Sequence, residues 1–408
     1  MKIINTNKFK ATYITINFIT KLKKEEVTKN IVWAKTILKA TNSGLKSLDI
    51  ERKFASLYSS SYGVGVEKLG DLFSIQFRVD FLDSKFLPNN YNVLEENLKL
   101  LSEIIYNPLV VNGAFDKEIV DKQKEIIKDI INSKKDDKKV YAINKCEELL
   151  NENPEDVYVY GKIEDLKNID EKVAYKQYQK VLEEADVEVV VTGNVTDNIE
   201  NIIKKYIKRI TGIRKEVNII TNNNEEVKVE IEHDSNMSQA ILMQGYKILN
   251  FKKEDLNKYI VLNTILGGGS TSKLFQNVRE KDSLAYYTYS RINRYTGKMF
   301  VCTGINPKDY NKTIELVNKQ IDDIKKGKIT DEEFNTAISL IENNYTELED
   351  IQTALDSVYL NNKLYNGRDT TVRNIIKEIQ EVSKNDVVEL ANNIIPKVVY
   401  MLGGNENV

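Results

Sequence analysis

The chain has 408 residues, a formal net charge of −2, and 41% hydrophobic against 29% charged residues. These values are typical of a folded globular protein and argue against a disordered one. The balanced charge shows no basic excess of the kind that marks nucleic-acid-binding proteins, although a neutral total can conceal a local patch. The length exceeds that of one ordinary hydrophobic core, so we expect two domains.

The sequence offers no sign of membrane insertion or export. Residues 1–8 lack a hydrophobic signal region, and no apolar run approaches the ~20 residues that a membrane-spanning helix needs. We therefore expect a cytoplasmic protein without a membrane span. Cys146 and Cys302 lie far apart, in a predicted helix and a predicted strand, and we expect buried reduced thiols rather than a disulfide.

The first half of the chain combines strands with long helices. Alternating residues predict a strand over 12–18, and apolar residues at helical spacing predict a helix over 24–41. A second helix over 46–60 is followed by an expected glycine-containing turn and a strand over 72–81. The remaining elements expected here are helices at 91–106, 114–133, 138–150 and 170–184, a strand at 187–195, and a helix ending near 210.

The second half repeats this order of elements after a polar stretch. We expect strands at 227–233 and 238–248, helices at 254–267 and 271–281, and strands at 284–293 and 298–305. Helices at 307–327, 331–348, 351–365, 370–380 and 385–394 should then precede a final strand at 398–403.

The two halves look like duplicates of one another. Thr36-Ile37-Leu38 and Thr264-Ile265-Leu266 occupy corresponding positions in the two halves, and the matching order of elements favours an internal repeat. Strands and helices segregate, which predicts an α+β fold with two tandem domains, each a largely antiparallel sheet flanked by helices. We place the N-terminal domain at 1–212, a linker at 213–226 and the C-terminal domain at 227–408.

The clearest local motif runs from Leu266 to Tyr286, with the sequence LGGGSTSKLFQNVREKDSLAY. Its glycines can end one helix and free the backbone to turn, and Ser270 or Thr271 can cap the next helix. A glycine-rich turn before a helix can also cradle phosphate. Neither a Gly-Lys-Ser/Thr sequence nor a preceding strand is present, so phosphate binding is disfavoured.

This motif closely resembles the C-terminal domain of the pitrilysin/insulinase-like, or mitochondrial processing peptidase-like, metallopeptidases. In that family an Arg, and a Tyr seven residues later, hold the backbone of an extended substrate; the resemblance assigns these roles to Arg279 and Tyr286. Guanidinium and phenol donors can bind peptide carbonyls without reading side chains. The alternative is a structural Arg and Tyr at a helix–strand junction, and Asp282-Ser283 departs from the Arg-Gly pair that is common there.

The resemblance also extends to the glycines of the motif. Gly267, Gly268 and Gly269 are similar to the flexible loop of inactive processing-peptidase subunits, although the loop is shorter here. The resemblance therefore implies that they contact substrate.

The zinc motif of the family is replaced in this chain. Active members carry His-x-x-Glu-His on the first long helix, which places two imidazole ligands on one helix face with the general base between them. The matching stretch here is Ile31-Val32-Trp33-Ala34-Lys35. The chain has one histidine, His233, so it cannot form a His–His pair. We expect no catalytic residue, no metal and no cofactor.

Two glutamates match the spacing of the family's later acidic residues. Glu118 and Glu125 lie seven positions apart on the predicted 114–133 helix, as a third zinc ligand and its acidic neighbour do in the family. Glutamate is also a good helix former, so both residues are more simply explained as part of a solvated face.

The resemblance implies a non-catalytic subunit of a heteromeric zinc peptidase. Its partner would be an active zinc-bearing paralogue in a heterodimer, and its ligand an extended peptide substrate; no nucleic acid is expected. Asp136-Asp137-Lys138-Lys139 followed by Tyr141-Ala142 resembles inactive members of the family in Gram-positive bacteria. The alternative is a peptide-binding or structural assembly protein with no peptidase partner. An unrelated enzyme chemistry has no support, because one histidine beside a linker is a poor candidate base.

Overall fold

The structure is a computed structural model that describes residues 1–88, 91–150, 157–195, 198–219 and 226–404. The chain divides into two compact units. The first unit comprises Met1–Ser133, Glu155–Asn218 and Leu348–Asp369, and the second comprises Lys134–Pro154, Ile219–Glu347 and Thr370–Val408. Within the described ranges, no helix has both the length and the apolar character needed to cross a bilayer.

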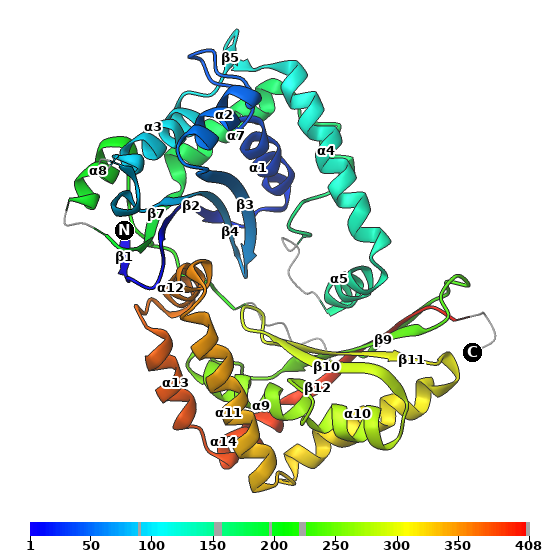
Figure 1. Cartoon of the computed structure of the whole chain (residues 1–408). Helices are drawn as coiled ribbons and strands as arrows, with labels where there is room; N and C mark the ends of the chain where they lie inside the picture. Colours follow the sequence, from blue (N-terminus) through cyan, green and yellow to red (C-terminus); the bar gives the residue numbers. More distant parts are fainter. Residues whose placement is uncertain (89–90, 151–156, 196–197, 220–225, 405–408) are drawn as a thin grey trace. The chain divides into compact units, whose positions relative to one another are not determined.

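The first unit is built on a five-stranded sheet in the order β1-β7-β2-β4-β3 (Figure 1). Neighbouring strands pair antiparallel except β1 and β7, which run parallel. The strands are β1 (Lys2–Asn5), β2 (Ala11–Lys21), β3 (Ser61–Leu69), β4 (Leu72–Leu82) and β7 (Asp186–Gly193). β3 and β1 are therefore the two edges of the sheet.

Helices cover both faces of this sheet. Their bounds are α1 (Lys24–Thr36), α2 (Ser47–Ser56), α3 (Val93–Tyr106), α4 (Lys117–Asp136), α6 (Ile163–Leu166), α7 (Glu171–Glu184), α8 (Ile199–Tyr206) and α12 (Gln352–Asn366), with a short ribbon of β5 (Val110–Val111) and β6 (Ala114–Phe115). Val189 and Val191 of β7 join the large core that contains α1, whereas Val190 packs with Tyr359 and Leu360 of α12. Because side chains alternate along a strand, α1 and α12 lie on opposite faces.

The second unit repeats the sheet with the same connectivity. Its order is β10-β11-β9-β12-β8, and the one parallel pair is again the first strand with the last, β8 with β12. The strands are β8 (Lys228–Glu232), β9 (Ala240–Ile248), β10 (Ala285–Asn293), β11 (Lys298–Ile305) and β12 (Ile394–Leu402). The predicted α+β fold with duplicated, largely antiparallel sheets flanked by helices is confirmed.

The helices of the second unit also flank their sheet (Figure 1). They are α5 (Lys138–Leu150), α9 (Leu256–Gly267), α10 (Tyr310–Lys325), α11 (Asp331–Leu348), α13 (Val372–Gln380), α14 (Lys384–Ala391) and a π-helix over Phe275–Lys281. Cys146 of α5 and Cys302 of β11 are both fully buried free thiols, as predicted.

Two helices belong to a unit other than the one expected from their place in the sequence. Helix α5, from the first half of the chain, is part of the second unit, and α12, from the second half, is part of the first. α5 follows α4 in the chain, yet Ala142, Cys146 and Leu150 pack on β9, β11 and β12 of the second unit. In the other direction, Gln352 at the start of α12 donates hydrogen bonds to the carbonyl oxygens of Ala11 and Thr192 in the first unit. The linear division at 213–226 thus remains a prediction of where the repeated sequences meet, because the compact units follow contacts instead.

One element of the first half contradicts the sequence prediction. The expected glycine-containing turn after the second helix is wrong, because residues 61–69 form the edge strand β3. Gly63 and Gly65 caused the error, since glycine disfavours strand interiors and usually marks turns. The short parallel strand β1 was also not predicted.

Candidate functional site

The replaced zinc motif lies on the inner part of α1 and faces the edge strand β3. Ile31 and Ala34 are buried, and they line a small hollow together with Lys35. Its other walls are Val64, Gly65 and Val66 of β3 and Tyr160. Trp33, at the middle of the motif, points away into the core, with its ring 5.5 Å from Tyr178 and 6.1 Å from Phe77.

These residues do not fit a zinc ion. Isoleucine and alanine offer no lone pair to a metal, and an ammonium group beside the site would repel one. Burial lowers the pKa of Lys35, and the nearby charges of Lys39 and Arg78 act in the same direction. Across the part of the chain that the structure describes, no three His, Cys, Asp or Glu side chains come together as a potential metal site.

The two glutamates with family-like spacing lie on a solvated face of α4. Glu118 is exposed, and Glu125 is exposed with its carboxylate 3.6 Å from the ammonium of Lys128. Neither lines the hollow beside Lys35. His233 is likewise exposed, just after β8. These positions agree with the surface interpretation of the two glutamates, and His233 has no second histidine with which to bind a metal.

The edge strand β3, which pairs only with β4 among the strands that the structure describes, was not predicted from the sequence. A Cβ at Gly63 would lie 3.3 Å from Nε of Arg78, whose side chain comes from β4, so this glycine gives room to the guanidinium. A Cβ at Gly65 would meet nothing within 4 Å. The edge is therefore bare at Gly65, which allows another backbone to approach closely there.

Arg279 and Tyr286 lie on either side of the junction between the π-helix and β10. The guanidinium of Arg279 stacks 4.5 Å over the Phe275 ring, and its Nε lies 3.7 Å from the Glu280 carboxylate. Tyr286 is 57% exposed on β10, the second unit's counterpart of β3 at the sheet edge. Tyr286 is thus accessible, while Arg279 already has local partners.

The three glycines of the motif are closely packed. A Cβ on Gly267 would lie 2.5 Å from the backbone nitrogen of Ser290, and one on Gly268 would lie 2.6 Å from the Cα of Thr264. Gly269 has Leu340 at 2.9 Å. Real Cβ atoms do not come so close, so Gly267 lets the end of α9 approach β10, while Gly268 packs on Thr264 of α9 and Gly269 on Leu340 of α11. This packing explains the glycines without a ligand.

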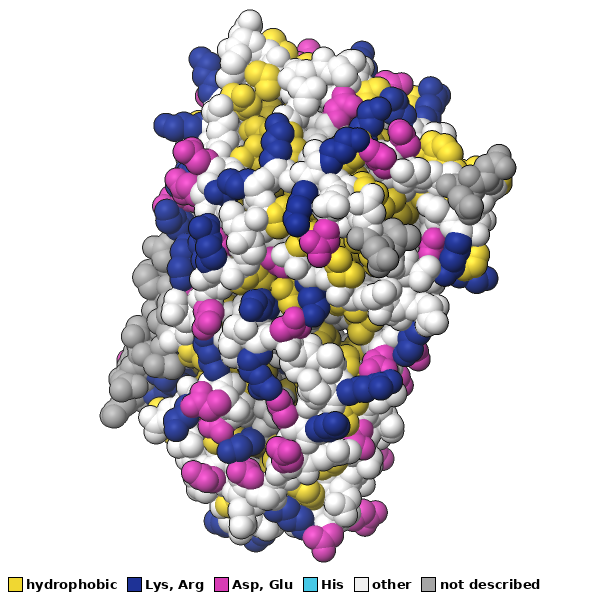
Figure 2. Space-filling model, turned by 90° about the vertical axis from the view of Figure 1, so that its left-hand side faces the viewer, with side chains coloured by type: hydrophobic (Ala, Val, Ile, Leu, Met, Phe, Trp, Pro, Cys, Tyr) yellow, Lys and Arg dark blue, Asp and Glu magenta, His cyan; other side chains and the backbone are white. Residues whose placement is uncertain are grey.

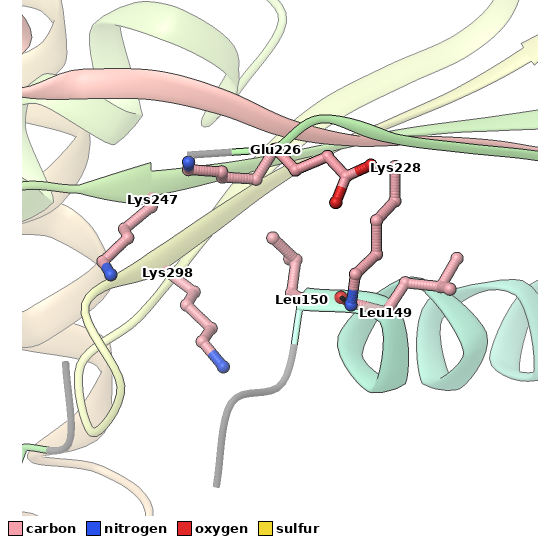
Figure 3. A pocket seen from close by; sticks show the side chains of 7 residues that line it. Leu149, Leu150, Glu226, Lys228, Lys247 and Lys298 are labelled. Carbon is pink, nitrogen blue, oxygen red and sulfur yellow. Dashed lines mark hydrogen bonds between the residues drawn. The ribbon is translucent and has the colours of Figure 1, made fainter. Parts of the chain in front are cut away.

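A second hollow in the second unit is surrounded by lysines from separate parts of the sequence (Figure 3). Lys228, Lys247, Lys298 and Lys397 gather with Glu226 around the C-terminal end of α5. The Lys228 ammonium donates a hydrogen bond of 2.8 Å to the carbonyl oxygen of Leu149. Because the last carbonyls of a helix carry partial negative charge, this bond from Lys228 stabilises the end of α5.

The surface shows no basic tract on the face displayed in Figure 2. Lysine and arginine side chains alternate there with aspartate and glutamate, and hydrophobic and uncharged groups lie between them. Such an interspersed pattern on this face fits the near-neutral net charge of −2.

Comparisons with known proteins identify the class. Residues 168–341 match the family described as Peptidase M16 inactive domain. The chain is 28% identical to the probable inactive metalloprotease YmfF of Bacillus subtilis, over 99% of this chain and 95% of that protein. It is 26% identical to the uncharacterized zinc protease YmxG of the same organism, over 51% of each.

A solved structure agrees over the full length. A conserved protein from Enterococcus faecalis superposes with a TM-score of 0.86 at 26% identity, covering 100% of this chain and 96% of that one. These similarities confirm the predicted resemblance to inactive members of the pitrilysin-like metallopeptidase family. The matched family is described as inactive, and the Bacillus subtilis relative is named a probable inactive metalloprotease, which agrees with the predicted absence of peptidase activity.

Proposed function

We propose that this chain is the cytoplasmic, non-catalytic subunit of a heteromeric zinc peptidase and binds part of an extended peptide for an active paralogue. The observation that carries the proposal is that the replaced zinc motif lies beside the sheet edge at β3, which pairs only with β4 among the described strands. Ile31, Ala34 and Lys35 provide no metal site, yet they still line a hollow against β3. An unpaired edge offers backbone N–H and C=O groups that an extended peptide can pair with.

The choice of partner is supported by the relatives. Bacillus subtilis has both a probable inactive metalloprotease and an uncharacterized zinc protease that are similar to this chain. A genome that holds both kinds can assemble an active chain with an inactive one. We therefore propose a heterodimer in which the zinc-bearing chain performs the hydrolysis.

A second peptide contact is proposed at the start of β10. Tyr286 is an exposed side chain, and Arg279 lies in the preceding π-helix. Both groups donate hydrogen bonds that peptide carbonyls accept. In this proposal, Gly267, Gly268 and Gly269 position the junction through the close packing around the end of α9.

The alternative of a structural assembly protein is favoured by one observation. Arg279 stacks on Phe275, and the glycines have packing reasons of their own. The whole motif could therefore serve the fold alone. Binding and cleavage measurements separate the two functions.

The test is co-expression of this chain with the active M16 paralogue of its genome. We expect size-exclusion chromatography to show a stable hetero-oligomer and a quenched-fluorescence peptide library to be cleaved only when both chains are present. Arg279→Ala and Tyr286→Phe should each lower the cleavage rate about tenfold, the effect of losing one hydrogen bond to a charged or polar partner.

The matched control is Tyr91→Phe, which removes the hydroxyl of another exposed tyrosine and should leave cleavage unchanged. Unaltered rates in the Arg279 and Tyr286 variants would make those residues structural. Failure of the two chains to associate would favour the assembly protein.

A further inference from the structure

Lys35 is a half-buried cation without an anionic neighbour. It lies in the last turn of α1, where the helix carbonyls favour a positive charge only modestly. Among the described residues, none forms an ion pair or hydrogen bond with its ammonium. The charged groups that act on it, Lys39 and Arg78, are both cations. A partly desolvated charge is unfavourable unless a counter-charge joins it.

The space in front of Lys35 is shaped for the end of one side chain. The hollow has a volume of about 10 Å³, which is room for about one water-sized group. Ile31, Ala34, Val64 and Val66 make its walls apolar, and Tyr160 closes one side. Among these lining residues the ammonium is the only charged group, so it sets the electrostatic preference of the hollow.

The neighbouring edge strand determines how a ligand would arrive. A peptide that pairs with β3 places successive side chains on opposite faces of the sheet. One set then points to the α1 face, where Lys35 lies. The other set points to the opposite face, where Arg78 reaches over Gly63. That second face also carries the carboxylates of Glu67 on β3 and Asp80 on β4, so the preference for a negative charge rests on Lys35 and the α1 face.

We propose that Lys35 supplies the positive charge of this site in place of a metal ion and selects extended peptides that carry a carboxylate beside β3. An ammonium–carboxylate hydrogen bond is stronger than a neutral one, whereas an amide in the same position leaves the lysine charge uncompensated. The inference rests on the proposed function, since it names the substrate class of the same site. The carboxylate comes from an Asp or Glu side chain or from a peptide C-terminus.

The test uses fluorescein-labelled peptides of alternating Thr and Val with one central residue varied. One peptide has Glu and an amidated C-terminus, a second has Gln and an amidated C-terminus, and a third has Gln and a free C-terminus. Anisotropy is measured on the chain alone and on its complex with a paralogue whose general base is removed. We expect a carboxylate-bearing peptide to bind at least tenfold more tightly than the amidated Gln peptide, and the free-C-terminus peptide shows which source is used.

The variants locate the effect. Lys35→Met keeps the length of the side chain without its charge and should abolish the preference, whereas Lys35→Arg should retain it. Lys29→Met, on the same helix, is the control that leaves the preference intact. Equal binding of all three peptides, or an undiminished preference in Lys35→Met, overturns this inference and leaves peptide binding standing. If no peptide binds to either preparation, peptide binding itself is refuted, and the inference with it.

Discussion

Replacing Asp356 by Asn should change how the stability of the first unit depends on pH. The pKa of Asp356 is raised to about 7, mainly because its carboxyl is buried. The hydrogen bond from Thr15 lowers this pKa, whereas the nearby charge of Glu67 raises it. The Thr15 hydroxyl donates to the carboxyl at 2.8 Å. An Asn side chain can accept the same bond, so the variant removes the titration and keeps the contact.

Proton linkage gives the direction in which the stability of the folded state changes with pH. The folded pKa lies above the ordinary value of 3.8, so the folded state holds its proton more tightly than the unfolded chain. The stabilisation is complete below pH 4 and is lost as the pH rises through 7. The free energy of unfolding of Asp356→Asn minus that of the wild type should therefore grow by about 4 kcal/mol between pH 4 and pH 8.

Trp33 provides the measurement. It is the only tryptophan of the chain and is buried in the core of the first unit, so urea unfolding followed by its fluorescence reports on the unit that holds Asp356. Asp129→Asn, at an exposed position of α4, is the control and should give a constant difference across this range. A constant difference for Asp356→Asn as well would show that the carboxyl titrates normally.

Gly245→Ala should loosen α5 from the sheet of the second unit. A Cβ at Gly245 would lie 2.8 Å from Cγ and Cδ1 of Leu150, and overpacking of this kind destabilises by roughly 1–3 kcal/mol. Cys146 on α5 and Cys302 on β11 are buried in the same cluster. Their reaction with a thiol reagent under native conditions should therefore accelerate about 5- to 30-fold for each 1–2 kcal/mol lost.

A double-mutant cycle identifies the contact. Leu150→Ala alone should also accelerate labelling, because it leaves a cavity under the helix. Combining it with Gly245→Ala should produce less than the sum of the two effects, since the added methyl group enters the vacated space. Gly65→Ala is the control, as its Cβ would meet nothing within 4 Å. Strict additivity, or a labelling rate unchanged by Gly245→Ala, would contradict the observed docking of α5.

Helices and strands could be predicted from the sequence where the apolar residues have a regular spacing and the ends carry clear capping residues. The helices from α9 to α14 and the strands β9 and β11 lie close to their predicted ranges, because their apolar spacing is regular, whereas β12 begins four residues before its predicted start. β3 was missed since Gly63 and Gly65 imitate a turn, and only the pairing with β4 shows that they belong to a strand. The exchange of α5 and α12 also escaped prediction, because an apolar stripe does not say which sheet it will cover.

Some features of the candidate site could be predicted from the sequence, and others could not. The replacement at Ile31, Ala34 and Lys35 is visible in the sequence, because a known ligand spacing had lost its ligands. That Lys35 faces a strand edge was not visible, since β3 follows more than twenty residues later. The lysines around the end of α5 come from four separated positions, and only tertiary structure brings them together.

The metal content of the purified chain tests the central claim most directly. Elemental analysis after expression in zinc-supplemented medium should find far less than one zinc per chain, and the chain alone should not cleave peptides. One tightly held zinc per chain, together with cleavage that a chelator abolishes, would contradict the account.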